Sequence, residues 1–425
     1  SEGKAMTWEN VNKHNGIVRI GAESTFGTTS SNMKALLNRA DPPWPLAGKT
    51  QQMIARQDSL TSRRAFQTPV KGMKSGSPVA LSVDVKPTSG RLNAAASPVA
   101  FSNASALSHQ LLWRAAMGGE LTPAAGTTVD SYSAPDVTVA SGHGTRFAVG
   151  QWFLYEATGG ALSLHQVTAI ATDVLTVQPP LPGTPANGEV IRNLYNYFLA
   201  EDDTTTFTVD HAPIEAGSNE AQSRGRGCVF SPELTLTLGG VPMLALNGTS
   251  ADHDGFGDLS LSETAVSDDM AAPFALDVSS GNGGLWLASS LSSTPSASLI
   301  TSVKLTIPRQ WQDIPGAGGV SSLAARKEVA GPQQQIQVEI ELRGGTAEVT
   351  AFANMSSRHL VLFGLSGTGT SGRAFLVHVP NAVPAVPPTV QINGELAFCR
   401  ATLTAQRNTL ATTDLGSSNV IVAWG

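Results

Sequence analysis

Residues 335–342 read QIQVEIEL, a stretch in which polar and apolar side chains alternate without a break. Ile336, Val338 and Ile340 fall on one side of an extended chain, and Glu339 and Glu341 fall on the other. Because successive side chains of a strand point to opposite faces, this stretch predicts a β-strand with one face in a core. The carboxylate row either lines something wet or is the solvated outer side of an antiparallel sheet.

The same alternation recurs along the chain between clusters of glycine, proline and serine. It is strongest at 77–85, where Asp84 lies on the polar side. Further strands are expected at 196–199, 205–210, 229–238, 241–246, 285–287, 299–307, 346–352, 359–363, 373–379, 389–392 and 395–404. The pairs Gly344-Gly345 and Asn393-Gly394 suit two-residue hairpin turns. The pattern predicts a mainly β, antiparallel protein.

Only residues 108–117 predict an amphipathic helix, with Ser108 as N-cap and Gly118-Gly119 as its end. Residues 126–193 hold five short strand patterns bounded by turn residues, which indicates a small barrel or sandwich inserted into a larger domain. That larger domain comprises 71–125 and 194–425. Residues 1–70, interrupted by prolines at 42, 43 and 45, are expected to run as an irregular extended arm across a neighbouring surface.

The composition limits the function classes. Charged residues make up 14% of the chain, against roughly 25% in an ordinary soluble protein, so we expect copies of the chain to cover much of the surface. A net charge of −6 argues against a protein that grips nucleic acid along its phosphates, which requires clustered Lys and Arg, but not against one along which nucleic acid slides. Cys228 and Cys399 are expected to be buried free thiols. The sequence shows no export signal and no membrane anchor.

Three motifs could indicate a binding site for a dinucleotide, a calcium ion or a phosphate. Residues 367–372 match GxGxxG, but the next residues predict a strand rather than the helix that a dinucleotide site needs. Asp252, Asp254 and Asp258 could form a calcium loop, although the spacing differs from that of an EF-hand. Arg224 and Arg226 could contact phosphate or pair with nearby carboxylates. No metal, cofactor or catalytic site is predicted, and the chain is not expected to be an enzyme.

The segment 21–28, GAESTFGT, resembles the opening motif of the major tail tube proteins of long-tailed (siphovirus-like) bacteriophages. Four later features resemble that family in order and spacing: the 77–85 strand, the 111–119 helix end, the basic glycine turn before 229–238, and the closing strands. The resemblance covers most of the chain outside 126–193. Segment 250–282 has no counterpart.

The resemblance implies two packed antiparallel sheets (a tail-tube sandwich or barrel) with one flanking α-helix, and subunits that form rings, usually hexameric. The rings stack into a tube through which genomic DNA passes during ejection without specific binding. The implied location is the virion tail, assembled in the host cytoplasm. The implied partners are copies of the chain, a tape measure protein, and tail terminator and distal tail proteins.

Within that family picture, Asp84, Glu339 and Glu341 are expected to line the lumen, because an acidic or neutral wall does not hold DNA. Contacts between stacked rings are expected from the arm, through Trp44, Arg56, Arg63 and Arg64. The inserted unit at 126–193 is expected to face outward.

The alternative function is an extracellular or virion-surface adhesin, in which the inserted β unit binds carbohydrate and calcium occupies the 252–258 loop. A polysaccharide-degrading tail component would need paired carboxylates, and no repeat period marks the β-helix typical of such enzymes.

Overall fold

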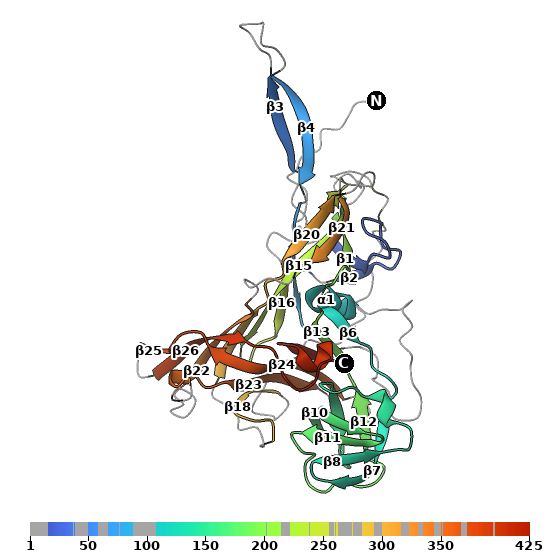
Figure 1. Ribbon diagram of the computed structural model, residues 1–425, viewed down its shortest axis with the longest axis vertical. Helices are drawn as coiled ribbons and strands as arrows, with labels where there is room; N and C mark the ends of the chain where they lie inside the picture. The colour runs from blue at the N-terminus through green and yellow to red at the C-terminus, as the bar shows by residue number, and fades with distance from the viewer. Residues whose placement is uncertain are drawn as a thin grey trace.

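The computed structural model describes residues 16–36, 38, 50–57, 67–75, 77–87, 108–200, 202–213, 222–237, 239–254, 259, 261, 274, 283–292, 300–315, 323–329, 335–343, 350, 352–366, 372–393 and 396–425. The fold is mainly β and antiparallel, as the alternation predicts (Figure 1). Seventeen strands belong to one connected system, which divides into three sheets, and six more close a separate barrel.

Sheet I is a seven-strand layer. In spatial order it contains β5 (Pro78–Asp84), β16 (Met243–Thr249), the second half of β15 (Ser223–Thr237), β19 (Ile300–Thr306), β22 (Gln337–Arg343), β26 (Leu396–Ala405) and β25 (Thr389–Asn393).

Sheet II lies against sheet I. Its strands are β18 (Gly283–Ala288), β23 (Arg358–Ser366), β24 (Arg373–Pro384), β27 (Ile421–Trp424), β13 (Tyr195–Leu199) and β6 (Gly118–Leu121). The long strand β24 joins the two sheets, since residues 375–378 pair with β27 and residues 382–384 pair with β26.

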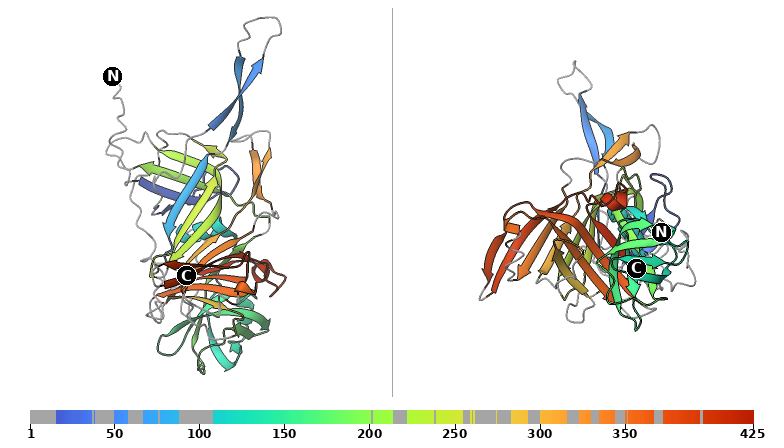
Figure 2. Two further views of the ribbon diagram at one scale, coloured as in Figure 1. Left: turned by 90° about the vertical axis from the view of Figure 1, so that its left-hand side faces the viewer. Right: turned by 60° about the horizontal axis from the view of Figure 1, so that its bottom comes forward.

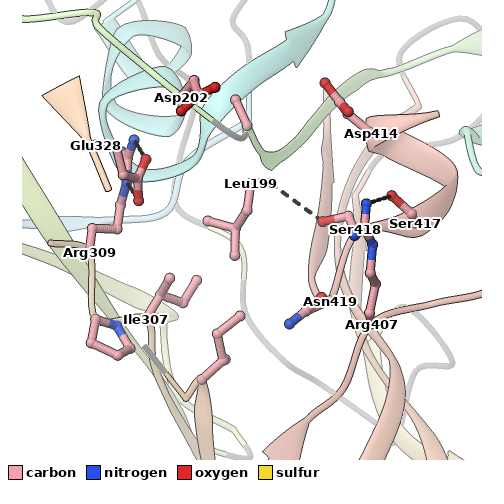
Figure 3. A pocket seen from close by; sticks show the side chains of 13 residues that line it. Leu199, Asp202, Ile307, Arg309, Glu328, Arg407, Asp414, Ser417, Ser418 and Asn419 are labelled. Atoms are coloured by element: carbon pink, nitrogen blue, oxygen red, sulfur yellow. Dashed lines mark hydrogen bonds and ion pairs between the residues drawn. The ribbon is translucent and has the colours of Figure 1, made fainter. Parts of the chain in front are cut away.

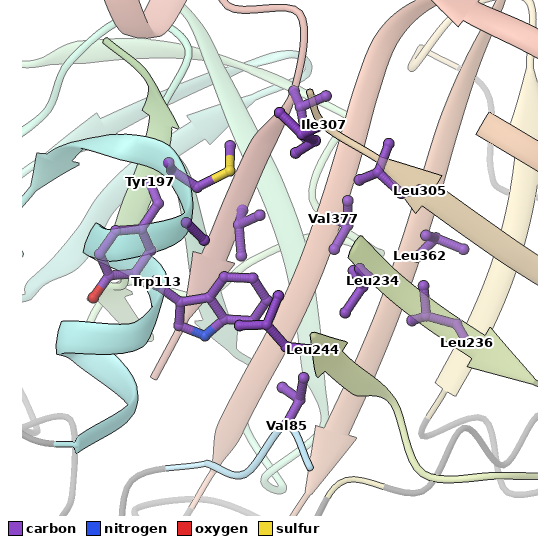
Figure 4. Close-up of a cluster of buried hydrophobic side chains, with 14 of the residues drawn as sticks. Val85, Trp113, Tyr197, Leu234, Leu236, Leu244, Leu305, Ile307, Leu362 and Val377 are labelled. Carbon is purple, nitrogen blue, oxygen red and sulfur yellow. The ribbon is translucent and has the colours of Figure 1, made fainter. Parts of the chain in front are cut away.

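The inner faces of the two sheets form the main core (Figure 4). Leu234, Leu244 and Leu305 come from sheet I, and Leu362 and Val377 come from sheet II. Helix α1 (Ser108–Met117) has the predicted bounds and adds Trp113 to this core. At the end of α1, Gly118 has a φ of +81°, the left-handed conformation that commonly ends helices.

Sheet III extends the system beyond helix α1. It contains β2 (Lys34–Leu36), β1 (Gly16–Ala22), β14 (Phe207–Pro213), the first half of β15, and β17 (Asp252–His253). Strands β1 and β2 correct the expectation that residues 1–70 form an irregular arm. Val18, Ile20 and Leu36 are buried in the main core, so this part of the chain gains its order from burial against distant strands.

Two hairpins form two-stranded sheets of their own. One pairs β3 (Thr50–Gln57) with β4 (Gln67–Ser75), and the other pairs β20 (Trp311–Pro315) with β21 (Leu323–Glu328). The β3–β4 hairpin projects from one end of the molecule (Figures 1 and 2). The arm expected at 1–70 is therefore partly a strand pair.

A closed barrel is formed within 127–193. Its strands are β7 (Thr127–Ser133), β8 (Asp136–Val139), β9 (Trp152–Glu156), β10 (Leu162–Ala171), β11 (Val174–Gln178) and β12 (Val190–Asn193). Strand β7 was missed because it buries little besides Val129 and its otherwise polar sequence lacks the alternation. Residues 144–146 form a 3₁₀ turn, and β9 begins at Trp152, five residues later than the strand that the sequence predicts at 147–155.

Two smaller expectations also need correction. Thr350 and Phe352 are helical, so the strand expected at 346–352 is wrong where the chain is described. A short helix, α3 (Asp414–Ser417), was not expected from the sequence. Strand β24 follows the GxGxxG segment, as predicted, while residues 367–371 and the Gly344-Gly345 turn lie outside the described residues.

Gly227 marks the point at which β15 passes from sheet III to sheet I, and its φ is +60°. A Cβ there would lie 2.7 Å from the Ala251 Cβ and 2.9 Å from the Phe26 ring. We expect Gly227→Ala to lower the free energy of unfolding by about 2–4 kcal/mol, because left-handed strain and overpacking add.

The matched control is Gly239→Ala. Gly239 has a φ of +74° but nothing within 4 Å of a built Cβ, so only the backbone strain applies. Urea unfolding of both variants measures the difference, and equal losses of stability would contradict the packing part of the argument.

Candidate functional site

The outer face of sheet I is polar and uncovered by the described residues. Cross-strand register places the apolar residues Met243 and Phe398 on this face, together with the following polar side chains, all at least partly exposed: Ser82, Ser231, Glu233, Thr235, Thr237, Ser302, Lys304, Thr306, Gln337, Glu339, Glu341, Thr389, Arg400, Thr402 and Thr404. We call this set the polar face. Hydroxyl groups predominate on it, and the alternate residues of the same strands fill the core.

Most charges on the polar face are paired. Lys304 Nζ lies 3.1 Å from Glu233 Oε2, and Arg400 Nε lies 2.8 Å from Glu341 Oε2. Glu339 is exposed, sits directly opposite Lys304 in the register, and forms no ion pair with any described residue. The set contains three carboxylates and two cations, and the register adds Arg343 at the end of β22 on the same side, so the charges of this face nearly balance.

A hollow of about 330 Å³ lies over the middle of the polar face, lined by Thr235, Lys304, Glu339, Glu341 and Arg400 among others. Its carboxylates, Glu339 and Glu341, keep contact with solvent, and hydroxyl groups lie beside them. The hollow is therefore a solvated part of the polar face.

Of the three residues expected to line a lumen, Glu339 and Glu341 lie together on the polar face. Asp84 does not share this open setting. Its register position opposite Met243 is at the end of the row, but it is only 6% exposed, and His109 Nε2 of helix α1 lies 2.7 Å from its carbonyl oxygen. Alternation alone assigned Asp84 to the polar side and could not show that other parts of the chain cover it.

The residues expected at inter-ring contacts are only partly placed. Arg56 lies in strand β3 of the projecting hairpin. Trp44, Arg63 and Arg64 lie outside the described residues.

A second cavity, of about 270 Å³, lies between the end of β13, the 307–309 link and the 407–419 segment (Figure 3). Its buried cation, Arg309, binds Glu328 through two nitrogens, at 3.0 and 2.6 Å, and Asp203 at 2.7 Å. Nη1 donates to the carbonyl oxygens of Ala115 and Ala116 at the end of helix α1. Burial disfavours the charge, but the ion pairs outweigh it and raise the Arg309 pKa. Arg309 is therefore a structural clamp.

The basic segment 224–227 is part of strand β15 rather than a turn. Arg224 binds Asp210 through two nitrogens, at 2.7 and 2.9 Å. Arg226 binds Asp252 at 2.9 Å and also pairs with Asp254. Both arginines are thus engaged by carboxylates, as the pairing alternative proposed. The same contacts occupy two of the three aspartates of the calcium-loop alternative, and Asp258 lies outside the described residues.

Among the residues that the structure describes, no group of three or more His, Cys, Asp or Glu side chains could hold a metal ion. No helix in the same part of the chain is long and apolar enough to cross a membrane.

Glu23 gives the 21–28 motif a physical role that the sequence did not reveal. Its carboxylate accepts hydrogen bonds from Thr206 Oγ1 (2.7 Å), Thr208 Oγ1 (3.0 Å), and the backbone N–H groups of Gly27 (2.9 Å) and Gly227 (2.8 Å). One carboxylate thus ties the end of β1 to β14 and to the bend of β15.

Lys304, Arg400 and Glu233 were also missed. Each lies at a polar position of a strand that the sequence predicted, so the alternation contained a signal for their outward orientation. The alternation does not show which strands are neighbours in the sheet, because the strand order depends on pairing between segments that are distant in sequence.

Comparison with protein-family models and with curated proteins finds no match to the chain.

Replacing Glu23 tests the role of the motif. Glu23→Ala leaves four donors without their charged acceptor, so we expect the free energy of unfolding to fall by about 2–3 kcal/mol. Ser24→Ala, at the neighbouring exposed position, should be neutral within about 0.5 kcal/mol. Chemical denaturation measures both, and a neutral Glu23→Ala would show that the carboxylate does not hold the strands together.

Proposed function

We propose that the chain is a structural subunit that assembles with copies of itself into stacked rings, and that the polar face lines their central channel. The observation that carries this proposal is the asymmetry of the sandwich. Sheet II is covered on both faces, by sheet I and by the barrel, whereas the described residues cover only one face of sheet I.

The open edge of sheet I supports assembly with further copies. Strand β25 pairs with β26 and has no partner on its other side among the described strands. It lies at the side of the molecule away from the barrel (Figures 1 and 2). An unpaired edge recruits further strands, and closing sheets around a ring removes such edges. At the other border of the sheet, the Asn38 Oδ1 accepts a hydrogen bond from the Ser82 N–H at 2.8 Å, so that edge is partly capped.

The chemistry of the polar face suits the passage of a polyanion. Duplex DNA is held by clustered Lys and Arg side chains that neutralise its phosphates. Lys304 and Arg400 are each paired with a glutamate, and hydroxyl groups surround them. Such a wall stays wet, and both cations of the defined set are paired, so DNA could slide along it without being retained.

The resemblance of the 21–28 motif to tail tube proteins supports the same assembly. On this proposal the subunit belongs to a phage tail, six copies form each ring, and genomic DNA leaves through the tube. The β3–β4 hairpin is the element we assign to contacts between rings, the barrel faces outward, and tape measure, terminator and distal tail proteins complete the tail.

Cysteine labelling of the assembled protein tests which face lines the channel. A thiol introduced by Glu339→Cys should react with N-ethylmaleimide in both free subunits and assemblies, but with a polymer-linked maleimide too large for the channel only in free subunits. Ser133→Cys, exposed on the barrel, is the matched control and should react with both reagents in both states.

The native thiols interfere little, because burial raises the pKa of Cys228 and of Cys399. Equal reaction of the large reagent with the thiol at position 339 before and after assembly would place the polar face outside. Electron microscopy that finds only monomers at every concentration, with and without tail initiation proteins, would contradict the assembly itself.

A further inference from the structure

The barrel docks on the outer face of sheet II through a compact apolar patch. From the barrel, Trp152, Leu154 and Leu164 contribute, and the sandwich contributes Val361, Ala374, Leu376, Ile421 and Ala423. A hydrogen bond from the Trp152 N–H to Asn196 Oδ1, at 2.8 Å, crosses from the barrel to β13. This docking covers the second face of sheet II.

A pair of histidines lies at this interface. The Trp152 indole Nε1 lies 3.2 Å from Nδ1 of His378, and Nε2 of His378 lies 3.2 Å from Nδ1 of His359. An indole N–H can only donate, so Nδ1 of His378 must accept and Nε2 must carry the proton. His378 then donates to His359. The relay from barrel to sheet therefore requires both imidazoles to be neutral.

Among the described residues, no carboxylate forms an ion pair with either ring, and the side chain of His359 is only partly buried. His378 is fully buried, and the His359 ring stacks on it at 5.5 Å. Burial, and for His378 also the neighbouring His359, lowers both pKa values. The paired strands β18 and β27 contain no titratable residue.

The charged groups on the other elements of this cluster do not help a protonated ring: Glu120 of β6 and Asp414 of α3 form no ion pair with either histidine among the described residues. Strand β9 carries Glu156, which is ion-paired with Arg192 of β12. On the histidines' own strands the charged residues are cations, Arg358 on β23 and Arg373 on β24. His165 of β10 lies apart, against Phe153 and Tyr155.

We propose that His378 and His359 form a pH-sensitive latch, which holds the barrel on sheet II at neutral pH and releases it on acidification. A second proton on His378 occupies Nδ1, so the indole N–H of Trp152 loses its acceptor, and it also places a positive charge in the apolar patch. The released barrel remains tied to the sandwich by the chain on both sides, so the change is a local opening.

The direction of the pH dependence follows from the difference in proton binding between the docked and undocked states. An exposed histidine takes up a proton near pH 6.5, and the docked state disfavours that proton. Below about pH 6.5 the undocked state binds more protons, so the docked population falls with decreasing pH. Each histidine shifts the docking equilibrium by up to about tenfold per pH unit, and both together by up to about a hundredfold.

A thiol placed inside the interface measures this opening in the full chain. Ala423 is fully buried in the patch, so the thiol introduced by Ala423→Cys reacts only when the barrel lifts. The rate of labelling is measured with a disulfide reagent that works at acidic pH. It is divided by the rate for Ser133→Cys at the same pH to give a normalised rate. We expect the normalised rate to rise at least tenfold between pH 7.5 and 5.5, while Cys228 in the main core stays protected.

The variants assign the effect. His378→Gln with His359→Gln should make the normalised rate independent of pH, because glutamine keeps polar groups but does not titrate in this range. His165→Gln should keep the full rise. If the double variant does not fold, His359→Gln alone should reduce the rise.

Three results would overturn the proposal: a flat rate in the protein with both histidines, an unchanged rise without them, or parallel labelling of Cys228, which would indicate opening of the whole sandwich.

Discussion

The structure depends on one constraint, namely that a two-layer sandwich covers only one face of each of its sheets. The barrel covers the second face of sheet II, so the central strands of this sheet are buried on both sides, as in β27 (Ile421–Trp424). Sheet I has no second cover among the described residues, so its outer face is built from hydroxyls and paired charges. The outer face of sheet I is therefore solvated and the outer face of sheet II is covered, and the proposed assembly rests on this difference.

A few buried polar groups fix how the layers meet. Arg309 joins the end of helix α1 to Glu328 and Asp203, and Glu23 joins β1 to β14 and β15. Arg309 is buried and Glu23 is partly buried, and most of the hydrogen-bond partners of both are distant in sequence. Because a buried charge without partners is costly, each of these contacts allows few alternative arrangements of the strands.

Local patterns in the sequence predicted much of the fold. Alternation located β22 and β5, and capping signals gave helix α1 its bounds. The sequence did not predict β1, which pairs with the distant strand β14, nor β7, whose sequence is mostly polar, nor the burial of Asp84. It placed Glu339 and Glu341 on one face, but Lys304 and Arg400 joined them only through the order of strands in the sheet, which is a non-local property. The role of Glu23 was hidden for the same reason.

The central claim is that the open face of sheet I becomes an inner wall once neighbouring subunits are added. A reconstruction of the assembled protein by electron cryomicroscopy, at a resolution that separates strands, tests it most directly. The account predicts a ring with sheet I turned toward the axis, the barrel at the periphery, and a strand of the next subunit beside β25. Particles in which the barrel faces the axis, or in which the outer face of sheet I remains exposed on the outside, would contradict it.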